Sequence, residues 1–138
     1  MEPVETPEML SGVRLNQRTP VGNVHVLIVV DVKTGKELEI FAQVGKSAGL
    51  PSSNLEALCR MISLFLRIGG TLAEVQKQLE GICANEEHTV LTKEGKVTSV
   101  ADGLGKAIRR YRKLKEKHGL PVLLTGGIDL DGKESGAS

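Results

Sequence analysis

The pattern of apolar and polar positions changes from period two to helical spacing about a third of the way along the chain. Before that point, residues 13–18 and the β-branched run 25–32 have the length and composition of strands. Residues 19–23 separate them, with Pro20 setting the backbone of a turn and Gly22 accepting a positive φ. The pattern therefore predicts two neighbouring strands joined by a turn.

A third strand is predicted over residues 38–44, after a turn at residues 33–36 that places Gly35 in a left-handed conformation. Period-two alternation divides the side chains between two faces. One face takes Leu38, Ile40, Ala42 and Val44, and the other takes Glu37, Glu39, Phe41 and Gln43. We expect a small antiparallel sheet of two or three strands with one covered face.

Three helices are predicted in the rest of the chain. The first opens at a capping box over residues 53–56 and carries a broad apolar stripe. The second begins at another capping box over residues 71–74, and the third is capped by Ser99 and ends at Gly119. Between the second and third helices, residues 89–91 form at most a brief strand.

Together these elements predict an α+β fold, with the small antiparallel sheet covered by about three α-helices. We expect one domain over residues 13–124, between a flexible N-terminal tail of residues 1–12 and a disordered C-terminal tail of residues 125–138. A chain of 138 residues can bury a core without metal or disulfide support. Because aromatic residues are scarce, Leu, Val and Ile must build that core.

Charge and cysteine content narrow the class of protein. A net charge of +1 predicts no general attraction to nucleic acid or membrane, and no apolar stretch approaches the ~20 residues of a membrane span. Cys59 and Cys83 occupy core-like helical positions, so we expect two buried free thiols in a reducing, cytoplasmic environment. No residue pattern indicates a metal site, a cofactor or a catalytic nucleophile.

The first candidate site is the loop between the third strand and the first helix. Its candidate anion- or nucleotide-binding residues are Gly45, Lys46, Ser47, Ser53 and Arg60. A glycine loop, a lysine and a helix N-terminus together favour negative charge. The loop is not a P-loop, because Ile40 stands where that motif needs its first glycine. A flexible connection with an ordinary helix cap is the alternative interpretation.

The second candidate is the basic face of the third helix, residues 103–118. Its candidate residues are Lys106, Arg109, Arg110, Arg112 and Lys113. Such a face suits the phosphates of a nucleotide or nucleic acid, or an acidic protein surface. A solvated helix face is the alternative, with cations placed toward the negative end of the helix dipole. If both candidates meet an anionic ligand together, Lys46 should lie close to Arg110 on a shared concave surface.

Several short motifs between residues 19 and 108 have a specific order and spacing. They are residues 19–23, Gly35, residues 39–41, Gly45, Lys46, and residues 56–64, 66–67 and 75–83. Residues 98–102 lie within this span and read Thr-Ser-Val-Ala-Asp. This arrangement resembles the TSCPD domain, which follows the catalytic barrel of adenosylcobalamin-dependent ribonucleotide reductases. Thr98, Ser99 and Asp102 match the Thr-Ser-Cys-Pro-Asp signature, whereas Val100 and Ala101 replace its cysteine and proline.

The resemblance implies helix-capping roles for Ser99 and Asp102, and it excludes a thiol role at Val100. It does not imply reductase activity for this chain alone, since the catalytic barrel, the cobalamin site and the C-terminal cysteine pair of those enzymes are missing from the sequence. We therefore expect an accessory or regulatory module of deoxyribonucleotide synthesis. It would bind a ribonucleotide reductase catalytic subunit or a nucleotide through the Gly45 loop and the basic helix.

Two alternatives stay open. The basic helix 103–118 could make the chain a nucleic-acid-binding domain, although few aromatic residues are present to stack on single strands. Alternatively, the apolar helix 54–68 and the open edges of a small sheet could pair two copies in a homo-oligomeric interaction protein.

Overall fold

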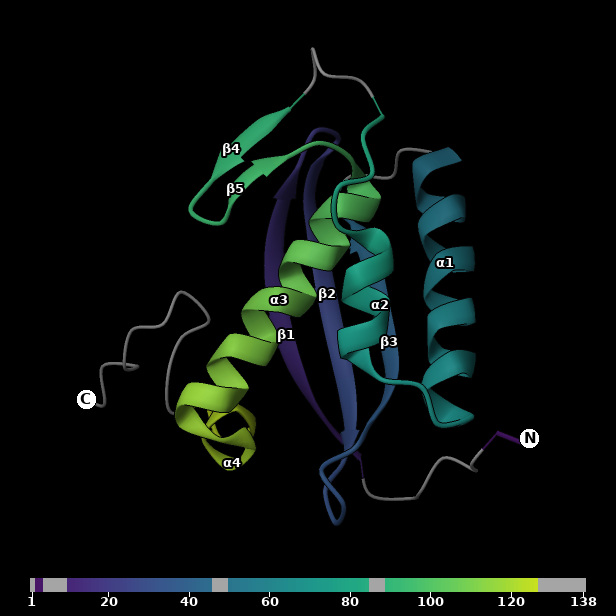
Figure 1. Cartoon of the computed structure of the whole chain (residues 1–138), viewed down its shortest axis with the longest axis vertical. Helices are drawn as coiled ribbons and strands as arrows, with labels where there is room; N and C mark the ends of the chain where they lie inside the picture. Colours follow the sequence, from purple (N-terminus) through teal and green to yellow (C-terminus); the bar gives the residue numbers. More distant parts are fainter. Residues whose placement is uncertain (1, 4–9, 46–49, 85–88, 127–138) are drawn as a thin grey trace.

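Three long strands and the helices packed against them confirm the α+β class. The computed structural model describes residues 2–3, 10–45, 50–84 and 89–126 (Figure 1). Its elements are β1 (Leu10–Thr19), β2 (Gly22–Asp31), β3 (Glu37–Val44), α1 (Leu50–Arg67), α2 (Leu72–Leu79), β4 (Val90–Thr92), β5 (Gly95–Val97), α3 (Val100–His118) and α4 (Leu120–Leu124). The strands form an antiparallel sheet of order β1-β2-β3 and a separate hairpin of β4 and β5.

The predicted hairpins form with the predicted turn glycines. Thr19 pairs with Gly22 across a two-residue turn, and Gly22 has a φ of 118°, a region that favours glycine. Gly35 has a φ of 73° in the second turn. β1 is longer than predicted, because its pairing with β2 continues as far as Leu10 opposite Asp31.

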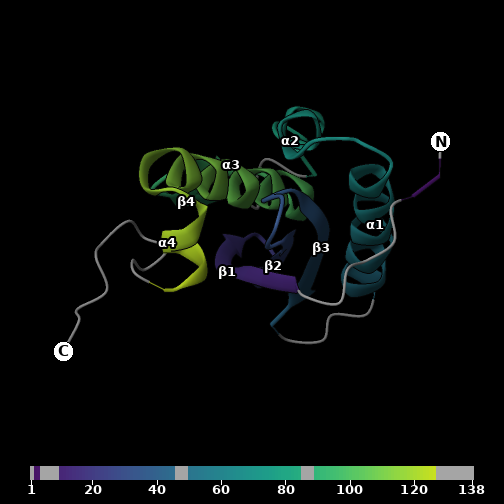
Figure 2. The ribbon, with the colours of Figure 1, turned by 90° about the horizontal axis from the view of Figure 1, so that it is seen from below.

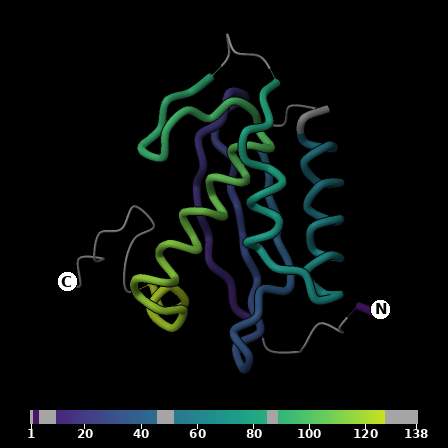
Figure 3. Tube along the Cα trace, viewed as in Figure 1, coloured from purple at the N-terminus to yellow at the C-terminus, as the bar shows by residue number. Residues whose placement is uncertain are grey.

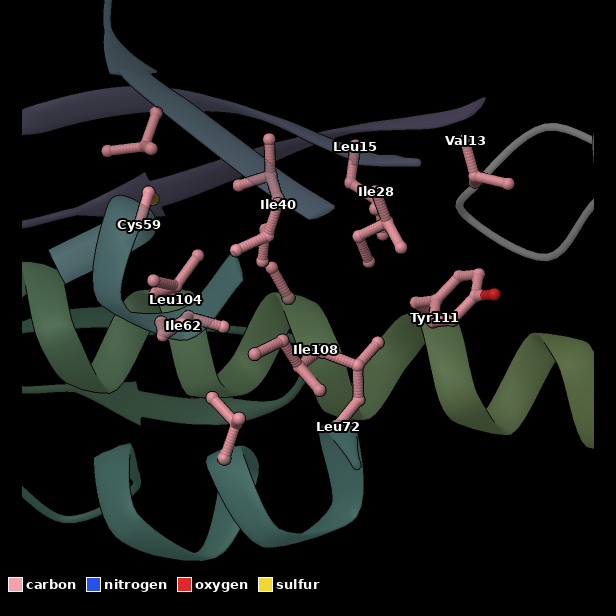
Figure 4. Close-up of a cluster of buried hydrophobic side chains, with 14 of the residues drawn as sticks. Val13, Leu15, Ile28, Ile40, Cys59, Ile62, Leu72, Leu104, Ile108 and Tyr111 are labelled. Atoms are coloured by element: carbon pink, nitrogen blue, oxygen red, sulfur yellow. The ribbon is translucent and has the colours of Figure 1, made fainter. Parts of the chain in front are cut away.

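The apolar face of the sheet lies against the helices and forms the core. α3 crosses this face, α2 packs beside α3, and α1 lies along β3 (Figure 2). Figure 4 shows Ile28 and Ile40 of the sheet beside Leu104 and Ile108 of α3 and Ile62 of α1. Each such side chain is buried, and full burial stabilises the fold by roughly 1.5–3 kcal/mol. The predicted division of β3 into two faces is therefore confirmed.

α1 covers the outer edge of β3 with polar atoms in place of another strand. Ser63 Oγ accepts a hydrogen bond from Ile40 N–H at 3.0 Å and donates one to Ile40 C=O at 3.2 Å. One turn earlier in α1, the Cys59 thiol receives a hydrogen bond from the backbone of Ala42. These contacts satisfy backbone groups that an edge strand would otherwise leave open.

The first capping box was predicted at the wrong place. α1 begins at Leu50, so Ser53 lies within the helix and does not cap it. Pro51 suits the first turn of a helix, where no N–H group is needed. The second capping box is confirmed, since Thr71 Oγ1 accepts from Glu74 N–H and the Glu74 carboxylate accepts from Thr71 N–H.

The C-terminal half differs from prediction at three further points. Cys83 is exposed and follows the end of α2, so only Cys59 is the buried thiol that was expected. β5 was not predicted, because a strand of three residues gives little alternation. α4 was not predicted either, since a proline soon after a glycine is typical of a helix end, whereas Pro121 occupies the first turn of this short helix. Figure 3 traces the chain from α3 directly into α4.

Candidate functional site

A groove of about 860 Å³ lies on the outer face of the sheet, beside α1. The register of the three strands determines which side chains form the floor of the groove. Arg14, Leu27 and Phe41 lie opposite one another across β1, β2 and β3. Phe41 is 52% exposed, whereas Leu27 is half-buried. The floor is therefore an apolar surface with a cationic side chain at one end.

A row of polar side chains lies next to this apolar row. Asn16, His25 and Gln43 are opposite one another in the sheet, and all three are exposed. Gly45 closes this end, with its N–H donating to Asn23 C=O at 2.8 Å. A Cβ at Gly45 would lie 3.4 Å from His25 Nε2. Gly45 and the imidazole of His25 are therefore neighbours at this end of the groove.

A polar stripe of α1 forms the wall of the groove. Its members recur every three or four residues and are Ser52, Glu56, Arg60, Ser63 and Arg67. Arg60 and Glu56 form an exposed ion pair with an N–O distance of 3.6 Å, and Arg67 lies 3.7 Å from Glu39 of β3. Exposed pairs of this kind contribute little to stability, so Arg60 can exchange Glu56 for another anion.

The groove contains part of the first predicted site. Gly45 and Arg60 line it, whereas Ser53 is exposed on α1 and does not. Lys46 and Ser47 lie outside the described residues. Arg14, His25 and Phe41 were not singled out from the sequence, because only the pairing of three strands places them together. The helical spacing of residues 52, 56, 60, 63 and 67 was the signal that could have revealed the wall.

Four cations of the second predicted site contact neighbouring elements, and Lys106 pairs with Asp102 within α3 itself. The contacts are Lys106 with Asp102 at 3.0 Å, Arg109 with Glu80 at 2.7 Å, Arg110 with Asn16 C=O at 2.8 Å, Arg112 with Gln76 at 2.7 Å and Lys113 with Glu94 at 3.9 Å. Lys115 also lies 3.1 Å from Glu37 of β3. The basic side of α3 thus holds α2, the sheet and the β4–β5 turn.

The two predicted sites do not share a depression in the described part of the chain. Arg109, Arg112 and Lys113 line one shallow depression with Glu37 and Gln76. Arg110 lines another, between β1 and β4. Gly45 and Arg60 belong to neither, and they lie on the other side of the sheet from α3.

The residues that match the TSCPD signature join the start of α3 to the segment after α2. Ser99 is the N-cap of α3, as predicted, and its Oγ accepts from Asp102 N–H at 2.9 Å. The same hydroxyl donates to Ile82 C=O at 2.6 Å. Thr98 Oγ1 lies 2.8 Å from the same carbonyl. We call this group of residues the α2–α3 clamp.

Asp102 is the buried centre of the α2–α3 clamp, with 1% of its surface exposed. Its carboxylate accepts from Gly81 N–H at 2.8 Å, from Thr98 N–H at 3.0 Å and from Lys106 Nζ at 3.0 Å. Burial opposes ionisation, but these donors outweigh it and hold the pKa of Asp102 below its usual value. The carboxylate is therefore a structural group, already saturated with donors.

The described residues show neither a metal-ligand cluster nor a membrane-spanning helix. Within the described ranges, no group of three or more His, Cys, Asp or Glu side chains is placed to hold a metal ion. No helix in the described part of the chain has the length and apolar content needed to cross a bilayer.

The structure defines a small α+β domain with an open groove on its sheet and a buried clamp at its signature residues. The family model of the TSCPD domain matches residues 5–112, which is more than half of the chain. The chain therefore belongs to the TSCPD domain family, as the motifs at residues 19–108 predicted. Comparisons with the curated proteins and with the solved structures gave no match.

Proposed function

We propose that this chain is an accessory or regulatory module of deoxyribonucleotide synthesis, which binds a ribonucleotide reductase subunit or a nucleotide. The observation that carries the proposal is the TSCPD family match over residues 5–112. The sequence resembles the segment that follows the catalytic barrel in cobalamin-dependent reductases, and a domain of this family is suited to act beside that barrel.

The state of the thiols supports binding in preference to catalysis. Val100 occupies the position of the signature cysteine, so that thiol is missing. Burial raises the pKa of Cys59 to about 12, against a smaller lowering by the Ala42 backbone hydrogen bond. A thiol with this pKa is protonated at neutral pH and is a poor nucleophile.

The outer side of α1 offers a surface for the reductase subunit. Met61 is 64% exposed and Leu64 is 38% exposed, and Ala57 lies one turn before Met61 on the same side. Neighbouring exposed apolar side chains are typical of protein contact surfaces. This surface supports binding of a reductase subunit, which is one of the two ligands that we propose.

Co-elution with a cobalamin-dependent reductase catalytic chain tests the proposal. We expect the mixture to elute as a complex and its turnover to change. Met61→Glu should weaken association about tenfold or more, because a charge would enter an apolar contact. Leu91→Glu is the matched control, since Leu91 is 72% exposed on β4, away from α1. Absence of both a complex and a change in turnover would contradict the proposal.

A further inference from the structure

We infer that the groove between the outer sheet face and α1 binds a nucleoside phosphate, with the base on Phe41 and the phosphates at Arg14 and Arg60. The inference rests on the proposed function, for which it names one ligand class and its site. Four observations support it: the exposed ring, the polar row beside it, the free positive charge and the size of the groove.

The exposed ring provides a stacking surface for a planar base. Phe41 is 52% exposed, and Leu27 extends the apolar surface onto β2. A Cβ at Gly12 would lie 2.8 Å from Leu27 Cδ1, so glycine lets Leu27 lean toward β1. Aromatic side chains can stack on any of the bases, so the exposed face of Phe41 can accept the base of a nucleotide.

The polar row lies where the edge of a stacked base would be. Asn16, His25 and Gln43 are next to the Arg14–Leu27–Phe41 row in the strand register and are exposed. Two amides and an imidazole provide both donors and acceptors. They can therefore hydrogen-bond the mixed donor and acceptor edge of a base.

Positive charge in the groove exceeds its negative charge. Among the described residues, the guanidinium and carboxylate groups that line it belong to Arg14, Arg60, Arg67, Glu39 and Glu56. Glu39 lies against Arg67, and Glu56 forms only an exposed pair with Arg60. Arg14 forms no ion pair among the described residues. Arg14 and Arg60 are therefore the two cations available to phosphate, and guanidinium suits phosphate oxygens bidentately.

The size of the groove favours a mononucleotide over a nucleic-acid strand. Its volume of about 860 Å³ falls within the range of about 300–1,000 Å³ typical of small-molecule sites. Among the described residues, Phe41 is the sole Phe, Tyr or Trp side chain that lines it, whereas strand-binding surfaces commonly stack successive bases on several rings. One base with its phosphates fits this arrangement.

Calorimetric titration of the full chain with the four ribonucleoside triphosphates tests the inference, with inorganic triphosphate as the comparison. We expect at least one nucleotide to bind more tightly than inorganic triphosphate. Phe41→Ala should weaken the nucleotide about tenfold and leave inorganic triphosphate unchanged, because it removes stacking alone. Arg14→Gln should weaken both ligands.

Matched controls separate the site from the fold. Leu91→Ala removes an exposed apolar side chain from β4, and Lys117→Gln removes an exposed cation from α3. Both should leave binding unchanged. Thermal unfolding of every variant should show an intact fold, and Phe41→Leu provides a second variant that keeps apolar bulk while losing the ring.

Three outcomes would overturn the inference. They are no binding by any of the four nucleotides, binding unaffected by Phe41→Ala and Arg14→Gln, and tighter binding of oligothymidylate that grows with its length. A complex with the reductase without nucleotide binding would defeat this inference alone. Nucleotide binding in the groove without any reductase complex or change in turnover would support the inference and defeat the reductase link.

Discussion

Asp102 is a carboxylate that the fold has removed from solvent and surrounded with donors. The resemblance to the TSCPD signature predicts a helix-capping role for Asp102, and its place in the first turn of α3 puts its charge at the positive end of the helix dipole. The structure shows that Asp102 also contacts the segment after α2, because Gly81 N–H donates a hydrogen bond to its carboxylate. A single side chain thus fixes how two helices meet.

Asp102→Asn should destabilise the protein by about 1–3 kcal/mol, because an amide cannot accept from all of these donors. Urea unfolding at neutral pH measures the change, with Glu116→Gln on the exposed side of α3 as the control. The pKa of Asp102 is lowered in the folded state. Its contribution is therefore full above the unfolded pKa of about 3.9 and is lost as pH falls through the folded pKa. Equal stability of variant and parent at pH 7 would contradict this role.

The two cysteines should differ in reactivity. Cys59 is buried with its pKa raised to about 12, and Cys83 is exposed. A disulfide reagent at pH 8 should modify one thiol in the native protein and two in denaturant. Cys83→Ser should abolish the fast reaction. Rapid modification of Cys59 in that variant would show that α1 does not stay against β3.

At the scale of elements, α1 depends on a hydroxyl group to meet the edge of β3. Ser63→Ala would leave Ile40 N–H and C=O buried without that partner. We expect a loss of about 1–3 kcal/mol in the free energy of unfolding. Asn54→Ala, on an exposed position of the same helix, is the control. If both variants unfold at the same urea concentration, these hydrogen bonds do not hold α1 in place.

Elements that depend on local pattern could be predicted from the sequence. Alternation in β3 identified its buried side chains, and the cap at Thr71 was identified with its helix, because neighbouring residues decide both. The start of α1 at Leu50 was not predicted, since Ser53 and Glu56 imitate a capping box while Pro51 starts the helix earlier. The groove was not predicted, because its formation depends on the register of three strands and on the position of α1 relative to the sheet. Neither property is local.

For the whole molecule, positive charge is more evenly compensated than the sequence suggests. The basic run of α3 looks like a charged patch in the sequence, yet Glu37, Glu80 and Glu94 pair with it from other elements, and Asp102 pairs with Lys106 within α3. The net charge is +1. The long-range field that attracts duplex DNA is therefore weak on this side of the protein.

Duplex DNA should show no salt-dependent mobility shift with this protein at about 0.15 M salt, where charges are screened beyond about 8 Å. A labelled duplex titrated with the full chain is the measurement. A shift that weakens with added salt and disappears when Arg109, Arg110 and Arg112 are all changed to Ala would instead favour the nucleic-acid-binding alternative.

Because α1 already occupies the outer side of β3, β1 is the only other edge that the three-stranded sheet offers to a foreign strand among the described residues. A fibre that grows by strand pairing needs two edges with unpaired backbone N–H and C=O groups on every subunit. With one edge taken by Ser63 and Cys59, association through the three-stranded sheet would stop after two molecules. The helix therefore limits growth of the sheet on that side, as well as forming one wall of the groove.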